Sequence, residues 1–120
     1  MNIFGHEYGF ALTVGASSEI ADLCPDGDLS RISEILSTDS FSSSAKAGAG
    51  IAVAMAKAYD EIKKFSGETV DHTPLTVEMV FALTQPEFMA VMGEALSAFG
   101  ADVKQTVEVE PSKKKENVEG

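Results

Sequence analysis

The chain has 120 residues, a formal net charge of −10 at pH 7 and 44% hydrophobic residues, which fits one globular domain with a single core. Residues 1–100 hold five lysines and arginines against fourteen carboxylates. Such an acidic body excludes the basic surface that nucleic-acid binding needs.

The N-terminal stretch NIFGHEYGFALTV predicts a short β-hairpin. It alternates in part and is rich in aromatic and β-branched residues, with Gly5 and His6 placed for a two-residue turn. Because an isolated hairpin is marginal in water, we expect its apolar face to cover the helices that follow. The apolar residues of this segment are Ile3, Phe4, Tyr8, Phe10 and Leu12.

Two short helices are predicted next. The first, over SSEIADLC, should begin after a Ser17 or Ser18 cap and end at Pro25 and Gly27. Asp28 should then cap the second helix, LSRISEILS, whose apolar residues share one face at helical spacing.

The longest predicted helix runs from about Ser43 to Phe65. Its larger apolar residues follow steps of four and three, a heptad pattern, at Ile51, Met55, Ala58, Ile62 and Phe65. Gly48 and Gly50 each cost about 1 kcal/mol relative to alanine, so close packing against a neighbour is the expected compensation. The charged residues near its end are expected to face solvent: Asp60, Glu61, Lys63 and Lys64.

Two further helices complete the predicted body. Thr76 precedes the short helix VEMVFAL, and TQPE forms a capping box in which Thr84 and Glu87 bind each other's backbone N–H groups. The helix opened by that box should run to Phe99 and stop at Gly100. The fold class is therefore mainly α, a compact bundle of about five helices in residues 1–100 with a short N-terminal β-hairpin.

Residues 101–120 are predicted to be an extended or disordered charged tail. In ADVKQTVEVEP, valines at odd positions alternate with polar residues, which is typical of a strand. From Pro111 onward, low hydrophobicity and dense charge favour disorder.

No residue pattern indicates catalysis or metal binding. Cys24, the only cysteine, has no recognisable spacing to His6 or His72, so we expect a buried core residue rather than a nucleophile. One cysteine and two distant histidines do not make a zinc site. His72 lies in a polar loop and is expected to be solvated. We therefore expect no enzyme and no catalytic, cofactor-binding or metal-binding residue.

The sequence also predicts a cytoplasmic protein without a membrane partner. Its N-terminus has neither the basic nor the apolar region of a signal peptide. In AKAGAGIAVAMAKA, Lys46 and Lys57 enclose only ten uncharged residues, about half of the roughly 20 that span a bilayer.

Binding is the function that remains, and methionines are the adaptable residues of surfaces that accept varied helices. Met55 and Met92 fall on apolar helix faces and are expected in the core. Met79 and Met89 are the candidate partner-binding residues.

The layout resembles the tail assembly chaperones of long-tailed, siphovirus-type bacteriophages. The resembling features, over residues 2–110, are the opening NIFGHEYGFALTVGASSEIADL, the long helix AKAGAGIAVAMAKAYDEIKKF, the helix pair LTVEMVFALTQPEFMAVMGEALSAFG and the charged tail. The resemblance implies a homo-oligomer in the host cytoplasm, absent from the mature virion. It also implies that the protein binds the tape measure protein, keeps it soluble and assists polymerisation of the tail tube around it.

Many members of that family also have a longer form, made by programmed ribosomal frameshifting, whose extension engages the tail tube protein. The segment SKKKE, with Lys113, Lys114 and Lys115, lies where the shift would be expected, because lysine codons can supply a run of adenines.

Two other classes stay open. A small acidic helical adaptor or inhibitor that binds a basic protein would also account for the charge, since electrostatic complementarity speeds encounter. A small enzyme is the third class, and a ligand or metal beside His6, Cys24 or His72 would favour it.

Overall fold

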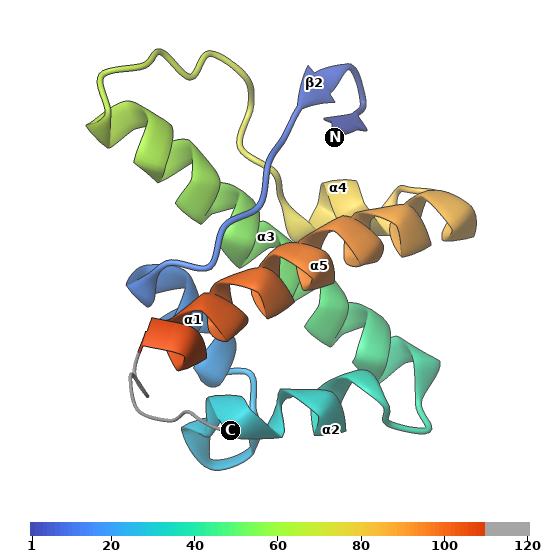
Figure 1. Cartoon of the computed structure of the whole chain (residues 1–120). Helices are drawn as coiled ribbons and strands as arrows, with labels where there is room; N and C mark the ends of the chain where they lie inside the picture. Colours follow the sequence, from blue (N-terminus) through green and yellow to red (C-terminus); the bar gives the residue numbers. More distant parts are fainter. Residues whose placement is uncertain (110–120) are drawn as a thin grey trace.

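The computed structural model describes residues 1–109, and side chains within residues 1–101. This part of the chain is a mainly α-helical globule with five α-helices and an N-terminal antiparallel hairpin (Figure 1), which confirms the predicted fold class. The elements are β1 (Asn2–Ile3), β2 (His6–Glu7), α1 (Val14–Ala21), the 3₁₀ turns η1 (Pro25–Gly27) and η2 (Leu29–Arg31), α2 (Ile32–Leu36), α3 (Phe41–Phe65), α4 (Val77–Phe81) and α5 (Gln85–Val109).

Helix α3 is the centre of the fold. It packs against α1, α2, α4 and α5, and Figure 1 shows α5 lying across it. The approach is close because the α3 face is built from small residues. A Cβ on Gly48 would lie 3.1 Å from the sulfur of Met92, and one on Gly50 would lie 2.9 Å from Cδ1 of Leu23. The predicted close packing at these glycines is confirmed.

The core contains the residues with the largest fully buried side chains, which are Tyr8, Ile20, Ile51, Met55, Val80 and Val91. Met55 and Met92 are buried as expected. Of the predicted heptad, Ile51, Met55 and Ala58 are buried, but Ile62 is 46% exposed and Phe65 89% exposed. The prediction was wrong for these two residues because the C-terminal end of α3 extends beyond its crossing with α5 (Figure 1).

The hairpin turn lies one residue earlier than predicted. Asn2 pairs with Glu7 and Ile3 with His6, so the two turn residues are Phe4 (φ 50°) and Gly5 (φ 85°). Two positive φ values are what a tight turn of this hand requires. Ile3 and Tyr8 are buried as expected, whereas Phe4 is 57% exposed because it occupies the turn itself.

Two helices begin earlier than the sequence suggested. Helix α1 is capped by Thr13, whose hydroxyl accepts from the backbone N–H of Ala16 at 3.1 Å, so Ser17 and Ser18 lie inside the helix rather than before it. Helix α3 is capped by Ser40. Asp28 does cap a helical segment, since its carboxylate accepts from the N–H of Ser30.

The predicted end of α5 was wrong. The helix continues through Gly100 to Val109, so residues 101–109 form neither a strand nor an extended tail. One glycine costs a helix only about 1 kcal/mol, and Gly100 does not adopt a positive φ. The predicted disorder of the chain beyond Pro111 falls outside the described residues.

Candidate functional site

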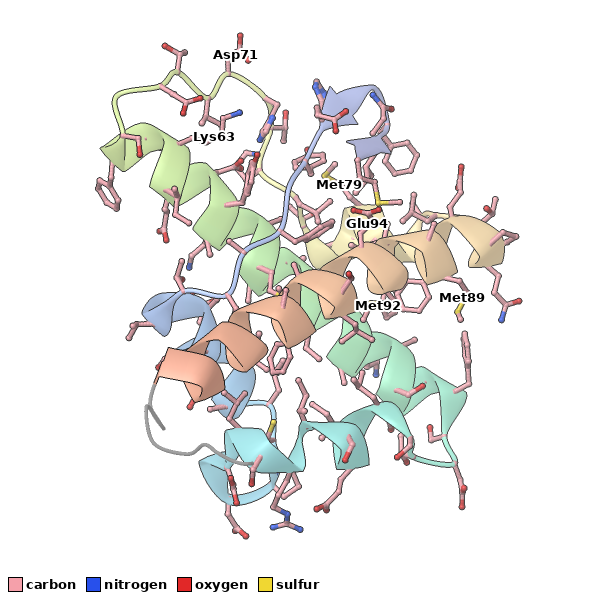
Figure 2. All side chains as sticks on the ribbon, in the orientation of Figure 1. Lys63, Asp71, Met79, Met89, Met92 and Glu94 are labelled. Atoms are coloured by element: carbon pink, nitrogen blue, oxygen red, sulfur yellow. The ribbon has the colours of Figure 1, made fainter. Side chains whose placement is uncertain are left out.

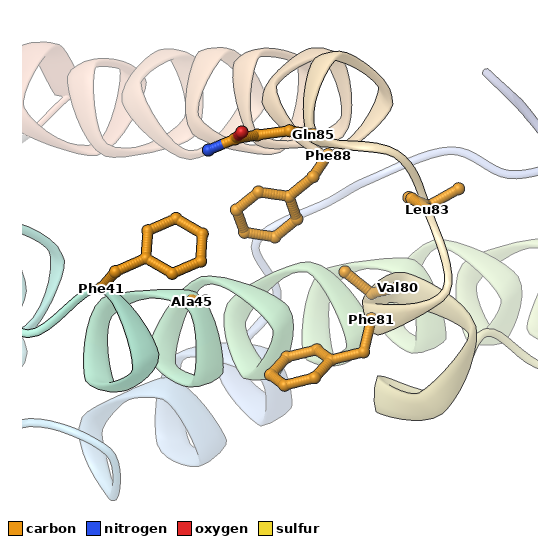
Figure 3. Close-up of a pocket in the computed structure, with 7 residues that line it drawn as sticks. All are labelled: Phe41, Ala45, Val80, Phe81, Leu83, Gln85 and Phe88. Carbon is orange, nitrogen blue, oxygen red and sulfur yellow. The ribbon is translucent and has the colours of Figure 1, made fainter.

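An open apolar groove lies where the start of α3 faces α4 and the start of α5. Its volume is about 310 Å³. Seven residues line it (Figure 3), namely Phe41, Ala45, Val80, Phe81, Leu83, Gln85 and Phe88. We call this feature the aromatic groove.

Three side chains in or beside the groove are more exposed than their size would suggest. Phe41 is 65% exposed and Phe81 52% exposed. Met89, next in the chain to the groove residue Phe88, is 63% exposed. Large apolar side chains gathered beside a concave surface are typical of a binding site rather than of ordinary protein surface.

Three capped helix starts and one buried anchor hold the groove in shape. Ser40 accepts from the N–H of Ser43 at 3.2 Å to begin α3, and Thr76 accepts from the N–H of Met79 at 3.1 Å to begin α4. Val80, which is 1% exposed, seats α4 in the core. The walls are therefore fixed by local hydrogen bonds and by burial.

The third start is the predicted capping box, which the structure confirms. The N–H of Thr84 donates to Oε1 of Glu87 at 2.9 Å, and the N–H of Glu87 donates to the hydroxyl of Thr84 at 3.4 Å. This reciprocal pair fixes the sharp turn between α4 and α5, and so places Leu83 and Phe88 on the groove.

The surroundings of the groove are acidic. The segments beside it, residues 39–45 and 76–83, contain the exposed carboxylates Asp39 and Glu78 but no lysine or arginine. Lys46, the residue after Ala45, lines a different pocket, and Glu87 lines a pocket beside the hairpin. A partner that fills the groove would therefore meet negative potential at its margins.

The structure does not bring the two predicted binding methionines together. Met89 is exposed, whereas Met79 is partly buried against the core. Figure 2 shows them on opposite sides of the α5 ribbon. Neither is a lining residue of the aromatic groove, although Met89 lies beside it. Lys113, Lys114 and Lys115 fall outside the described residues.

Phe41 and Phe81 line the groove but were not among the predicted binding residues. Phe41 stands among serines in STDSFSSS, and a lone aromatic at a helix start has no apolar neighbour in its own turn. That isolation was the available indication that its side chain would stay partly uncovered.

A second cluster joins the N-terminal segment, α3 and the loop after α3. Nε2 of His72 lies 2.9 Å from Oδ2 of Asp60, with the two side chains 13% and 11% exposed. The Tyr8 ring lies 4.6 Å from the His72 ring between centroids. The Tyr8 hydroxyl donates to the carbonyl oxygen of Thr73. We call the first contact the Asp60–His72 pair.

Both members of that pair were predicted to be solvated, and both predictions were wrong. The loop after α3 folds back along the helix, so His72 covers Asp60 while Tyr8 covers His72. Burial raises the pKa of the Tyr8 phenol, and the negative charge of Asp60 adds to this effect. The cluster accordingly fastens three segments to one another.

Cys24 lies outside this cluster, in another part of the fold. Cys24 is 6% exposed, and its thiol donates to the carbonyl oxygen of Ile20 at 3.4 Å. Burial raises the pKa of the thiol, with smaller contributions from the charges of Asp28 and Glu34. Its predicted burial is confirmed, and the reactive thiolate is disfavoured.

Among the described side chains, no group of three or more histidine, cysteine, aspartate or glutamate residues is placed to hold a metal ion. None of the helices in residues 1–109 combines the length and hydropathy that a membrane span requires.

Comparisons of the chain with protein-family models, with curated proteins and with solved structures found no match.

Proposed function

We propose that this protein is a tail assembly chaperone that binds the tape measure protein, keeps it soluble and assists tail tube polymerisation around it. The observation that carries the proposal is the aromatic groove with exposed Phe41, Phe81 and Met89 at its edges. A long helical protein with apolar faces aggregates unless those faces are covered, and a helix-lined apolar groove can cover them.

The size of the groove supports reversible binding. Seven residues line it, whereas stable interfaces use about 20–30 residues on each side. A single groove should therefore hold its partner weakly and release it when tube subunits compete. Several copies bound along one long partner would add their affinities through avidity.

Other parts of the proposal rest on the family resemblance alone. These are homo-oligomerisation, a longer frameshifted form that engages the tail tube protein, action in the host cytoplasm and absence from the mature virion. The proposal includes no catalytic step, cofactor or metal.

Co-expression with a tape measure protein from the same genome tests the proposal. We expect the tape measure protein to move into the soluble fraction and to co-purify with this chain. The Phe81→Ser variant should reduce both effects. Val14→Ser is the matched control, because Val14 is 90% exposed and lies on α1, away from the groove. A tape measure protein that stays insoluble beside the wild-type chain would contradict the proposal.

The gene provides an independent test of the longer form. We expect a slippery heptamer at the codons for Lys113, Lys114 and Lys115, followed by an overlapping reading frame. Mixed codons without such a frame would remove the frameshifted form from the proposal.

The alternative is a small acidic adaptor or inhibitor that binds a basic protein. It is favoured by the excess of carboxylates over basic residues in residues 1–100. It predicts affinity for a basic protein that moderate salt abolishes, without any effect on the solubility of a tape measure protein.

A further inference from the structure

The lining of the aromatic groove limits what can enter it. Six of its seven residues are apolar, and Gln85 supplies the single polar side chain. An extended segment would bring unpaired backbone N–H and C=O groups into a groove that offers them one amide. A helix satisfies these groups internally, so a helix is the backbone form that this lining accepts.

The margins of the groove limit the charge of that helix. Asp39 lies just before the α3 wall, and Glu78 lies in the first turn of α4. No lysine or arginine occurs in the wall segments to offset them. Lysine or arginine beside the apolar face of a partner would therefore be attracted, and glutamate or aspartate would be repelled.

We propose that the aromatic groove binds an amphipathic helix whose apolar face, spaced at i, i+3 or i+4 and i+7, is bordered by lysine or arginine. The natural partner is then a helical segment of the tape measure protein, and this identification rests on the proposed function. The apolar docking surface and its preference for a basic helix follow from the groove residues and do not depend on that function.

The test uses two synthetic helical peptides of about 18 residues, roughly five turns, as probes. Both carry the same leucine and phenylalanine face, one with lysines and the other with glutamates beside it. Binding to the full chain is measured by calorimetry, and the site is mapped by amide chemical shifts. We expect the lysine peptide to bind with a Kd on the order of 10–100 µM, as suits an interface below the standard size. The glutamate peptide should bind at least about tenfold more weakly.

A matched pair of variants separates local from overall charge. Asp39→Asn and Glu78→Gln together neutralise the margins. The control removes the same number of charges from exposed carboxylates away from the groove, with Glu61→Gln and Glu68→Gln. We expect the first variant to lose affinity for the lysine peptide about fivefold or more, and the control about twofold or less.

A second pair of variants tests the apolar contact. Phe81→Ser and Phe41→Ser change exposed side chains, so both chains should keep their helical circular dichroism. Each should weaken binding of the lysine peptide about tenfold or more. Val14→Ser should leave the affinity unchanged.

Several results would overturn the inference. Equal affinity for the two peptides would do so, as would equal losses in the two charge variants or shift changes centred away from the groove. A second copy of the chain is the competing occupant, through the exposed Ile62 and Phe65. The wild-type chain would then form a concentration-dependent dimer that excludes the peptide, and Phe65→Ser would convert it to a monomer. That result would identify a second copy of the chain, not a basic helix, as the occupant of the groove.

Failure of this inference can be told apart from failure of the proposed function. If Phe41→Ser and Phe81→Ser still keep the tape measure protein soluble, the groove is not its site and the chaperone function stands. If the lysine peptide binds the groove but the tape measure protein stays insoluble, the proposed chaperone function is wrong and the groove is still a helix-binding site.

Discussion

Replacing His72 with alanine should destabilise the fold, because it removes the hydrogen-bond partner of the Asp60 side chain. Oδ2 of Asp60 contacts His72 Nε2 at 2.9 Å, and Oδ1 has no hydrogen-bond partner among the described residues. The variant therefore leaves a carboxylate that is 11% exposed without any partner.

The size of the loss follows from that geometry. Removing the hydrogen-bond partner of a buried charged group costs about 1.5–3 kcal/mol, and this range applies to Asp60 because its side chain is only 11% exposed. Loss of the contact between the His72 and Tyr8 rings adds about 0.5–1 kcal/mol. We expect the free energy of unfolding to fall by about 2–4 kcal/mol, which lowers Tm by roughly 10–25 °C for a domain of this size.

Urea unfolding followed by far-ultraviolet circular dichroism measures the loss. The midpoint should fall while the slope of the transition stays the same. His6→Ala is the matched control, because His6 is an exposed histidine whose ring lies 6.4 Å from that of His72. It should change stability by less than about 0.5 kcal/mol.

The double variant Asp60→Ala, His72→Ala sharpens the test. It should lose less stability than the sum of the two single variants, because no unpaired carboxylate remains. A loss below about 0.5 kcal/mol in His72→Ala, or additive losses in the double variant, would refute the claim that Asp60 depends on His72.

Three further predictions concern single sites. Gly93→Ala should stabilise the fold by about 0.5–1 kcal/mol, because an added Cβ meets nothing within 4 Å; Gly50→Ala should gain less or lose stability, since its Cβ would lie 2.9 Å from a leucine side chain. The Cys24 thiol, buried and with a raised pKa, should react with a thiol reagent at least about 100-fold more slowly in the native chain than in urea. The pKa of Tyr8 is raised above 10.0, by burial and then by the charge of Asp60, so the unfolded chain loses this proton first and the contribution to stability is lost above about pH 10. Tyr8→Phe should cost about 1 kcal/mol at neutral pH and reduce this alkaline loss in a pH series of urea midpoints.

Features fixed by neighbouring residues could be predicted from the sequence. The Thr84–Glu87 box and the Asp28 cap were found because each depends on residues within one helical turn. The close packing at Gly48 and Gly50 was also predictable, since glycine inside a long helix needs a reason.

Features that depend on distant segments could not be predicted. Asp60 and His72 are 12 residues apart in the chain, and no local pattern says that the loop folds back onto α3. The predicted end of α5 was wrong for a local reason, because Gly100 keeps a φ that is not positive and a glycine inside a helix costs only about 1 kcal/mol.

The aromatic groove combines features that the sequence predicts with one that it does not. Each of its helix starts follows from a local cap, yet the groove exists because three such starts meet in space. Phe41 belongs to one chain segment and Phe81 to another. The two exposed rings form one surface only because the fold brings these two segments together.

The Asp60–His72 pair and the aromatic groove lie at opposite ends of α3, and the structure indicates that they act independently. The loop that carries His72 leads into α4, but α4 has its own anchors in Val80, 1% exposed, and Leu75, 6% exposed. These buried side chains should hold the groove wall even when the loop is loosened. At a temperature where it is fully folded, His72→Ala should therefore bind the lysine peptide within about twofold of the wild-type affinity. Val80→Ala should lower both stability and affinity, because it removes the anchor of the wall itself. If His72→Ala loses affinity in proportion to its stability, the loop and the groove form one cooperative unit, and the buried anchors of α4 are insufficient to hold the site.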